Sequence, residues 1–210
     1  GATVLDAVNR LGLPLPQLCK DPDRPALGAC RTCLVQVDGV KDFPASCHLP
    51  ARPGLVVRTD TPEVARIRKG VLDLTLGMLT PSIEGHGFGQ LSDAAARHGL
   101  LRSGFGPLHA FRVDASKSFF VLDRDACILC GRCTVACDEV QQIGAISLVG
   151  RNHATRVGVF SDTLLASSVC TSCGQCVATC PTGALRPKER AGNIVRETET
   201  TCPYCGVGCG

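Results

Sequence analysis

The chain has 210 residues, of which 44% are hydrophobic, and its 23 Gly, 13 Pro, single Tyr and absent Trp predict several small, loop-rich units rather than one large core. The formal net charge is +3, but Lys and Arg are dispersed, so we expect no nucleic-acid partner. No run of about 18 apolar residues occurs, which predicts no membrane-spanning segment.

The N-terminal region combines one helix pattern with short strand patterns. Thr3 followed by Asp6 is a capping-box pattern, and apolar residues recur behind it at helical spacing until Gly12. Residues 33–40 (CLVQVDGV) alternate apolar and polar positions and end in an Asp-Gly turn, which predicts a hairpin strand. Residues 54–59 (GLVVRT) predict another short strand.

A second helix pattern opens the middle of the chain. Thr61 is a typical cap, and Pro62 occupies the first position of a helix expected to run to about residue 79. Residues 80–117 are rich in Gly and weakly periodic, so we expect a linker with one short helix near residues 91–98.

An internal repeat dominates the C-terminal half. Residues 127–137 (CILCGRCTVAC) and 170–180 (CTSCGQCVATC) match at every cysteine and at the intervening Gly, with a constant offset of 43. Residues 119–123 predict a strand before the repeat, and residues 146–150 and 156–160 predict an inserted hairpin between its halves.

The 15 cysteines fall into four groups along the chain. Disulfide frameworks scatter their cysteines, whereas C-x2-C runs are typical of thiolate ligands to a shared metal. The pattern therefore predicts metal binding in a reducing compartment, and the last group lacks one ligand. The groups are Cys19, Cys30, Cys33 and Cys47; Cys127, Cys130, Cys133 and Cys137; Cys170, Cys173, Cys176 and Cys180; and Cys202, Cys205 and Cys209.

The repeated C-x2-C-x2-C-x3-C is the ligand spacing of bacterial two-cluster ferredoxins, in which the fourth cysteine of each run ligates the other cluster. A zinc site would prefer two separated C-x2-C pairs, so zinc is the weaker alternative. Asp138 stands where Pro usually follows the last cysteine, and we expect it to loosen the local turn without removing a ligand. The expected [4Fe–4S] ligand sets are Cys127, Cys130, Cys133 and Cys180 for one cluster, and Cys170, Cys173, Cys176 and Cys137 for the other.

The first cysteine group has a longer first gap than plant-type ferredoxins. Its loop LGACRTC (27–33) resembles the [2Fe–2S] module of complex I's large peripheral iron–sulfur subunit, of iron-only hydrogenases and of NAD-linked formate dehydrogenases. The resemblance implies a β-grasp [2Fe–2S] domain, with a zinc site or free thiols as the alternatives. Gly28 and Ala29 would let backbone N–H groups approach the sulfurs. The implied ligands are Cys19, Cys30, Cys33 and Cys47.

In those families the spacer holds a further cubane through H-x3-C-x2-C-x5-C. That spacing can be laid onto this chain from His86, but the three cysteine positions then hold Gln90, Asp93 and Gly99. Because a cubane needs four donors, we expect no cluster here, and we expect electrons to bypass this position.

Residues 202–209 (CPYCGVGC) match the C-x2-C-x3-C start of the molybdopterin oxidoreductases, whose fourth cysteine lies further along the chain. Residues 1–8 lack the hairpin that normally precedes the first helix of a β-grasp ferredoxin, so both ends look clipped. The order of modules looks most like the alpha subunit of a cytoplasmic molybdenum- or tungsten-dependent formate dehydrogenase. Assimilatory nitrate reductases share the CPYCGVGC motif but generally lack the ferredoxin prefix. The resemblance implies a third [4Fe–4S] cluster at Cys202, Cys205 and Cys209 in a longer protein only.

The expected fold class is therefore α+β, in four regions: a [2Fe–2S] ferredoxin-type domain (1–60), a helical spacer (61–117), a double-cubane ferredoxin-like domain (118–190) and the start of a molybdopterin oxidoreductase domain (196–210). The resemblance implies electron transfer between a molybdenum or tungsten bis-pterin site beyond residue 210 and a flavin- and NAD-binding, diaphorase-type subunit or a ferredoxin. No catalytic residue is expected in this segment. The alternatives are an NADH-quinone oxidoreductase-type or iron-hydrogenase-type subunit, or a stand-alone electron carrier.

Overall fold

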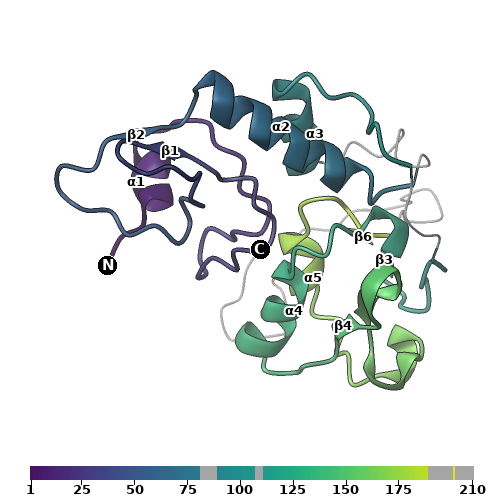
Figure 1. Ribbon diagram of the computed structural model, residues 1–210. Helices are drawn as coiled ribbons and strands as arrows, with labels where there is room; N and C mark the ends of the chain where they lie inside the picture. The colour runs from purple at the N-terminus through teal and green to yellow at the C-terminus, as the bar shows by residue number, and fades with distance from the viewer. Residues whose placement is uncertain (81–88, 107–110, 189–200, 202–210) are drawn as a thin grey trace.

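The computed structural model describes residues 1–80, 89–106, 111–188 and 201. In Figure 1 the N-terminal domain lies at the left, two spacer helices lie across the top, and the repeat domain lies below them at the right. The helices are α1 (Val4–Arg10), α2 (Pro62–Leu76), α3 (Gly89–Arg97), α4 (Arg132–Val135) and α5 (Gln175–Thr179). The strands are β1 (Gln36–Val37), β2 (Val57–Arg58), β3 (Phe120–Leu122), β4 (Ser147–Val149), β5 (Arg156–Gly158) and β6 (Leu185–Pro187).

The expected capping box of the first helix is confirmed. The Thr3 amide donates to Asp6 Oδ2 at 2.8 Å, and the Asp6 amide donates to Thr3 Oγ1 at 3.2 Å, so two otherwise unpaired amides at the start of α1 are satisfied. The apolar face of α1, with Leu5 fully buried, packs on a core that includes Cys33 and Cys47. The first helix therefore supports the cysteines that are expected to bind metal.

The expected hairpin strand is much shorter than its pattern. The Asp-Gly turn forms, with the Val40 amide donating to the Val37 carbonyl, but β1 pairs with β2 rather than with the segment directly after the turn. That segment contributes one bridge, between Leu34 and Ala45. Pro44 has no N–H to extend the ladder, which explains why pairing stops there.

Helix α2 begins as expected, with the Thr61 hydroxyl accepting a hydrogen bond from the Val64 amide at 3.3 Å. It ends at Leu76 rather than near residue 79. Gly77 follows it, and a Cβ there would lie 2.9 Å from Phe105 Cβ, so the loop around Phe105 packs directly against the end of the helix. The short helix expected near residues 91–98 is confirmed as α3, which packs beside α2 (Figure 1).

The repeat domain contains two small antiparallel sheets. The predicted inserted hairpin is confirmed as β4 paired with β5. The strand predicted at 119–123 is confirmed as β3, and it pairs with β6, which follows the second half of the repeat. This pairing returns the end of the second half to the start of the first. No helix in the described part of the chain is long and apolar enough to cross a bilayer.

Candidate metal centres

All twelve cysteines in the described residues are free, and the structure gathers them at three places. We call these the N-terminal site (Cys19, Cys30, Cys33 and Cys47), the inner site (Cys127, Cys130, Cys133 and Cys180) and the outer site (Cys137, Cys170, Cys173 and Cys176). The expected tail site at Cys202, Cys205 and Cys209 lies outside the described residues, as does His86.

The N-terminal site surrounds one sulfur with hydrogen-bond donors. A hydrogen bond from Cys30 lowers the pKa of Cys19 most strongly, burial opposes it, and the amides of Cys30, Ala29 and Gly28 lower it further, to about 5. Burial and the charge of Cys33 raise the pKa of Cys47 to about 12. The lowered pKa of Cys19 agrees with the expected approach of the Gly28 and Ala29 amides to a sulfur. An amide-lined thiolate of this kind suits a cluster ligand, whose sulfurs accept N–H hydrogen bonds.

The loop that supplies those amides needs glycine at residue 28. Gly28 has φ +70°, and an added Cβ would lie 2.6 Å from Nε2 of His48. Gly39 offers a matched control, because it has φ +77° and nothing within 4 Å. In both alanine variants the left-handed backbone lowers the free energy of unfolding by about 1–2 kcal/mol. Only Gly28→Ala also displaces the His48 ring and the amides near Cys19.

We therefore expect Gly28→Ala to lower incorporation of a two-iron cluster well below that of Gly39→Ala. Iron content and visible absorbance after anaerobic reconstitution measure the difference. Equal incorporation in the two variants would contradict the role given to this loop.

The two halves of the repeat adopt the same backbone conformation. Leu129 and Ser172, at equivalent positions, have φ of 53° and 62°. The following Gly131 and Gly174 have φ of 79° and 78° and begin α4 and α5. Each C-x2-C turn thus bends away from regular helix before its helix starts, which leaves amides free to face the cysteine sulfurs. The Leu129 amide, for example, lies 3.4 Å from the Cys127 sulfur.

The inner site takes its fourth cysteine from the other half of the repeat. A single apolar cavity is lined by three cysteines of the first half and by Cys180, together with Leu122 and Val157. The Leu185 amide donates to the Cys180 sulfur at 3.5 Å. The structure therefore brings together the four cysteines expected to share one cluster.

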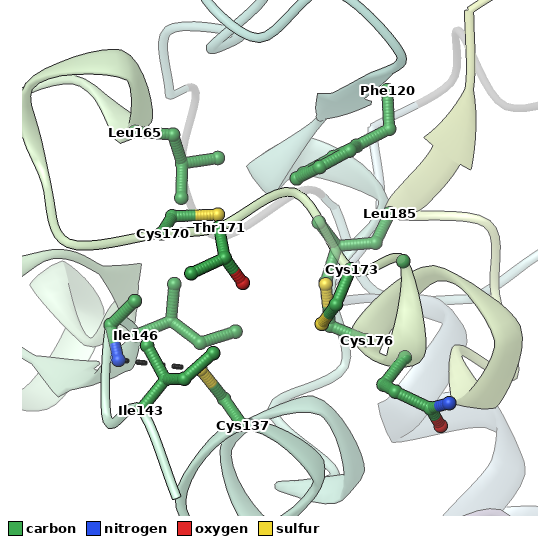
Figure 2. A pocket seen from close by; sticks show the side chains of 13 residues that line it. Phe120, Cys137, Ile143, Ile146, Leu165, Cys170, Thr171, Cys173, Cys176 and Leu185 are labelled. Atoms are coloured by element: carbon green, nitrogen blue, oxygen red, sulfur yellow. Dashed lines mark hydrogen bonds between the residues drawn. The ribbon is translucent and has the colours of Figure 1, made fainter. Parts of the chain in front are cut away.

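The outer site mirrors this arrangement. Cys170, Cys173 and Cys176 line a cavity into which Cys137 points from the first half (Figure 2). The Ala145 amide donates to the Cys137 sulfur at 3.3 Å, drawn as a dashed line in Figure 2. Leu185 lines both this cavity and the inner one, and it is 3% exposed. One buried leucine therefore lies between the two sites.

The turn that contains Asp138 differs from the equivalent turn in the second half of the repeat. Where Pro181 follows Cys180, α5 ends, but after Cys137 the chain continues as a π-helical turn over Ala136–Val140. Asp138 has an amide N–H and no ring, so it permits this continuation where proline would stop it. This turn is wider than an α-helical turn, because the Gln141 amide donates to the Ala136 carbonyl five residues before it, and Cys137 still faces the outer cavity.

The thiols of the repeat domain are held in surroundings that disfavour bare negative charge. Burial raises the pKa of Cys127 to about 11, with the Leu129 amide opposing it. Burial raises the pKa of Cys130 to about 12, and burial followed by the charges of Cys170, Cys173 and Cys137 raises that of Cys176 to about 12. Crowded, buried sulfurs need a positive partner to become thiolates, and iron ions supply that charge. Both cavities therefore fit a metal cluster.

Among the described residues, no three His, Cys, Asp or Glu side chains form a group able to hold a single metal ion. The four cysteines of the inner site instead line one cavity, and the four cysteines of the outer site line another.

A continuous apolar core links the N-terminal site to the inner site. It contains Cys19 and Cys130, Leu72 of α2 and Leu91 of α3. Gln90 and Asp93, two of the three spacer positions that lack the expected thiol, line a separate cavity together with Asn9, residues 15–18, Lys20 and Pro22 of the N-terminal domain. Sequence reasoning missed this packed junction, since no local pattern in the spacer indicates which residues it will contact.

Comparison with known proteins identifies both ferredoxin-type regions. Residues 1–62 match the family of 2Fe-2S iron-sulfur cluster binding domains, and residues 126–184 match the family of 4Fe-4S dicluster domains. A chain in the crystal structure of an NAD+-reducing [NiFe]-hydrogenase in the H2-reduced state has a TM-score of 0.80 and 32% sequence identity, covering 93% of this chain and 83% of that one.

Two curated relatives are oxidoreductase subunits. The chain is 35% identical to a G-type subunit of the NADH-quinone oxidoreductase of Rhizobium meliloti (strain 1021), over 100% of this chain and 25% of the relative. It is 36% identical to the HndD subunit of the NADP-reducing hydrogenase of Solidesulfovibrio fructosivorans, over 93% of this chain and 35% of the relative. The chain therefore spans about a quarter to a third of the length of these relatives.

Proposed function

Because the chain belongs to the family of ferredoxin-type iron–sulfur subunits that includes the matched chain of NAD+-reducing [NiFe]-hydrogenase, we propose that it carries electrons inside a subunit of the NADH-quinone oxidoreductase G type or of the hydrogenase type. The observation that carries this proposal is the gathering of twelve described cysteines into three sets of four within one packed chain. The N-terminal site would hold a [2Fe–2S] cluster in a β-grasp domain, and the inner and outer sites would each hold a [4Fe–4S] cluster.

When bound, the clusters supply one-electron oxidation and reduction. The residues of the chain hold the clusters, donate hydrogen bonds to sulfur and keep water away. The amides of Gly28, Ala29, Leu129 and Ala145 serve the second of these tasks. Leu185, between the inner and outer cavities, serves the third. No group in these sites has to make or break a covalent bond of a substrate.

A flavin- and NAD-binding, diaphorase-type subunit is the partner that this assignment favours, because the similar proteins are named for reactions with NADH, NAD+ or NADP. We expect the protein to work in the cytoplasm, where thiols stay reduced. A ferredoxin remains a second partner of suitable chemistry.

A formate dehydrogenase alpha subunit is the second candidate. It is supported by the C-x2-C-x3-C motif at residues 202–209, which resembles the start of a molybdopterin oxidoreductase domain. The two curated relatives are instead hydrogenase and NADH-quinone oxidoreductase subunits, so they favour the alternative over the formate dehydrogenase reading. A downstream cysteine followed by a large pterin-binding domain in the complete coding sequence would decide for formate dehydrogenase.

The iron stoichiometry tests the proposal. Anaerobic reconstitution of this chain is expected to yield about 10 iron and about 10 sulfide per chain, from one two-iron and two four-iron clusters. A variant with serine at Cys202, Cys205 and Cys209 is the control and should retain the same content. A content of about 14 iron that falls to about 10 in this variant would place a further cubane in the tail. Colourless protein, or protein containing zinc without sulfide, would refute the proposal.

A further inference from the structure

Arg132 is a buried cation between two cysteine ligands of the inner site. It follows the left-handed Gly131 at the start of α4 and is 4% exposed. A buried charge is strongly unfavourable unless it is paired and hydrogen-bonded. The contacts of its guanidinium group therefore explain why it can stand there.

Those contacts join three parts of the chain. Arg132 Nε donates to Thr179 Oγ1 at 3.0 Å, and Nη1 donates to Gln90 Oε1 of α3 at 2.8 Å. Nη2 lies 3.8 Å from Asp21 Oδ2 of the N-terminal domain. The Thr179 hydroxyl accepts from Arg132 and donates its own proton to Asp21 Oδ2 at 2.5 Å. Each hydrogen bond of this network therefore pairs one donor with one acceptor. The network ties the N-terminal domain and the spacer to the repeat domain.

The network lies between two proposed clusters. Asp21 follows Cys19 by two positions, and Thr179 directly precedes Cys180. Cys19 and Arg132 line the same small cavity, next to the apolar core that contains Cys19 and Cys130. Charges act strongly in such a poorly hydrated place.

The local balance of charge is positive. Arg24 Nη1 lies 3.5 Å from the same Asp21 carboxylate that faces Arg132, so two guanidinium groups share one carboxylate. A cluster held by four thiolates becomes more negative when it is reduced, and a nearby cation stabilises that reduced form.

On these grounds we propose that Arg132 is the positioning residue of the junction: it fixes the inner site against the N-terminal site, and its charge eases reduction of the clusters on both sides. The proposal rests on the proposed function, because it assumes that both sites hold clusters. It assigns Arg132 no contact with a reacting atom.

Two substitutions separate charge from geometry. Arg132→Gln removes the charge, whereas Arg132→Lys keeps it but cannot form the same fork of hydrogen bonds. Arg186→Gln is the matched control, because Arg186 lies in the same domain and pairs with Asp123 at 3.2 Å, outside the network. Reduction potentials come from titrations followed by electron paramagnetic resonance, and the magnetic interaction between the reduced N-terminal and inner clusters reports on their separation.

Arg132→Gln is expected to make reduction of the inner cluster about tenfold less favourable, which is about 59 mV for one electron, and to weaken the magnetic interaction. Arg132→Lys should leave the reduction potential of the inner cluster close to the wild-type value and lose part of the magnetic interaction. Arg186→Gln should change neither. Wild-type values of both quantities in Arg132→Gln, or equal shifts in Arg132→Gln and Arg186→Gln, would overturn the proposal.

A third measurement does not depend on bound clusters. In the whole chain as purified, amide hydrogen exchange near residues 20–24 and 175–180 should be faster in Arg132→Gln than in Arg186→Gln. If Arg132→Gln fails to assemble the inner cluster, Gln90→Leu removes a partner of Arg132 that lies on α3, away from the cysteine ligands, and it should weaken the magnetic interaction. An unchanged interaction in Gln90→Leu would overturn the proposal. Wild-type protein without iron would refute the proposed function, and the exchange comparison would still test the junction.

Discussion

Replacing Cys137 by serine is expected to remove the outer [4Fe–4S] cluster and to leave the inner one in place. Cys137 lies in the first half of the repeat, yet it points into the cavity formed by Cys170, Cys173 and Cys176 (Figure 2). Its charge is also among the causes that raise the pKa of Cys176. Loss of one thiolate from a four-ligand set should therefore cost this site about four iron atoms, measured by iron analysis and Mössbauer spectroscopy.

Three further variants make the assignment secure. Cys173→Ser and Cys130→Ser give reference spectra for loss of the outer and inner clusters, because each lies in the middle of its own run. Cys180→Ser is the mirror of Cys137→Ser and should match Cys130→Ser. A Cys137→Ser spectrum that matches Cys130→Ser instead would show that each run ligates its own cluster, and the crossed assignment would be wrong.

The local structure of the two cysteine runs could be predicted from the sequence to be the same, because the runs repeat the same spacing. The same spacing gives the same positive φ angles at Leu129 and Ser172 and the same glycine-capped helix starts. The exchange of the last ligands joins distant residues, and it was predicted from the ligand spacing of two-cluster ferredoxins. The capping box at Thr3 and Asp6 is local and needs no knowledge of distant contacts.

The contacts between units could not be predicted in this way. Arg68 lies on the buried side of α2 and donates to the Leu34 carbonyl at 2.6 Å and the Thr59 carbonyl at 3.0 Å. In the sequence it is one charged residue of an amphipathic helix. The sequence around Arg132 likewise does not show that α3 and the loop after Cys19 supply its partners. A buried cation is tolerated only where partners from several segments meet, and that meeting is a property of the whole fold.

The predicted length of the strand at residues 33–40 was wrong for a related reason. The alternating pattern of residues 33–40 is genuine, but a strand also needs a partner with free amides. Pro44 removes one donor from the partner on one edge, where a single bridge forms, and pairing with β2 on the other edge covers two residues on each side. The apolar positions still face the core, as the burial of Val35 and Val37 shows. The alternating pattern thus predicted which side chains are buried, whereas the available pairing partners determined the length of the strand.

The core of the junction gives the largest expected effect on stability. Leu72 of α2 is 0% exposed and packs in the cluster that contains Cys19 of the N-terminal site and Cys130 of the inner site. Leu72→Ala is expected to lower the free energy of unfolding by about 2–5 kcal/mol, because a cavity opens where neither domain can collapse freely. It should also speed loss of iron to a chelator, since water would reach both sites.

Leu74→Ala is the matched control on the same helix. Leu74 is 57% exposed, so its truncation should change the free energy of unfolding by no more than about 0.5 kcal/mol. Urea titrations followed by circular dichroism, in the presence and absence of clusters, compare the two variants. If Leu72→Ala were as mild as Leu74→Ala, the N-terminal domain and the repeat domain would not share a core. If Leu72→Ala destabilises only the cluster-loaded chain, the junction forms on cluster binding rather than before it.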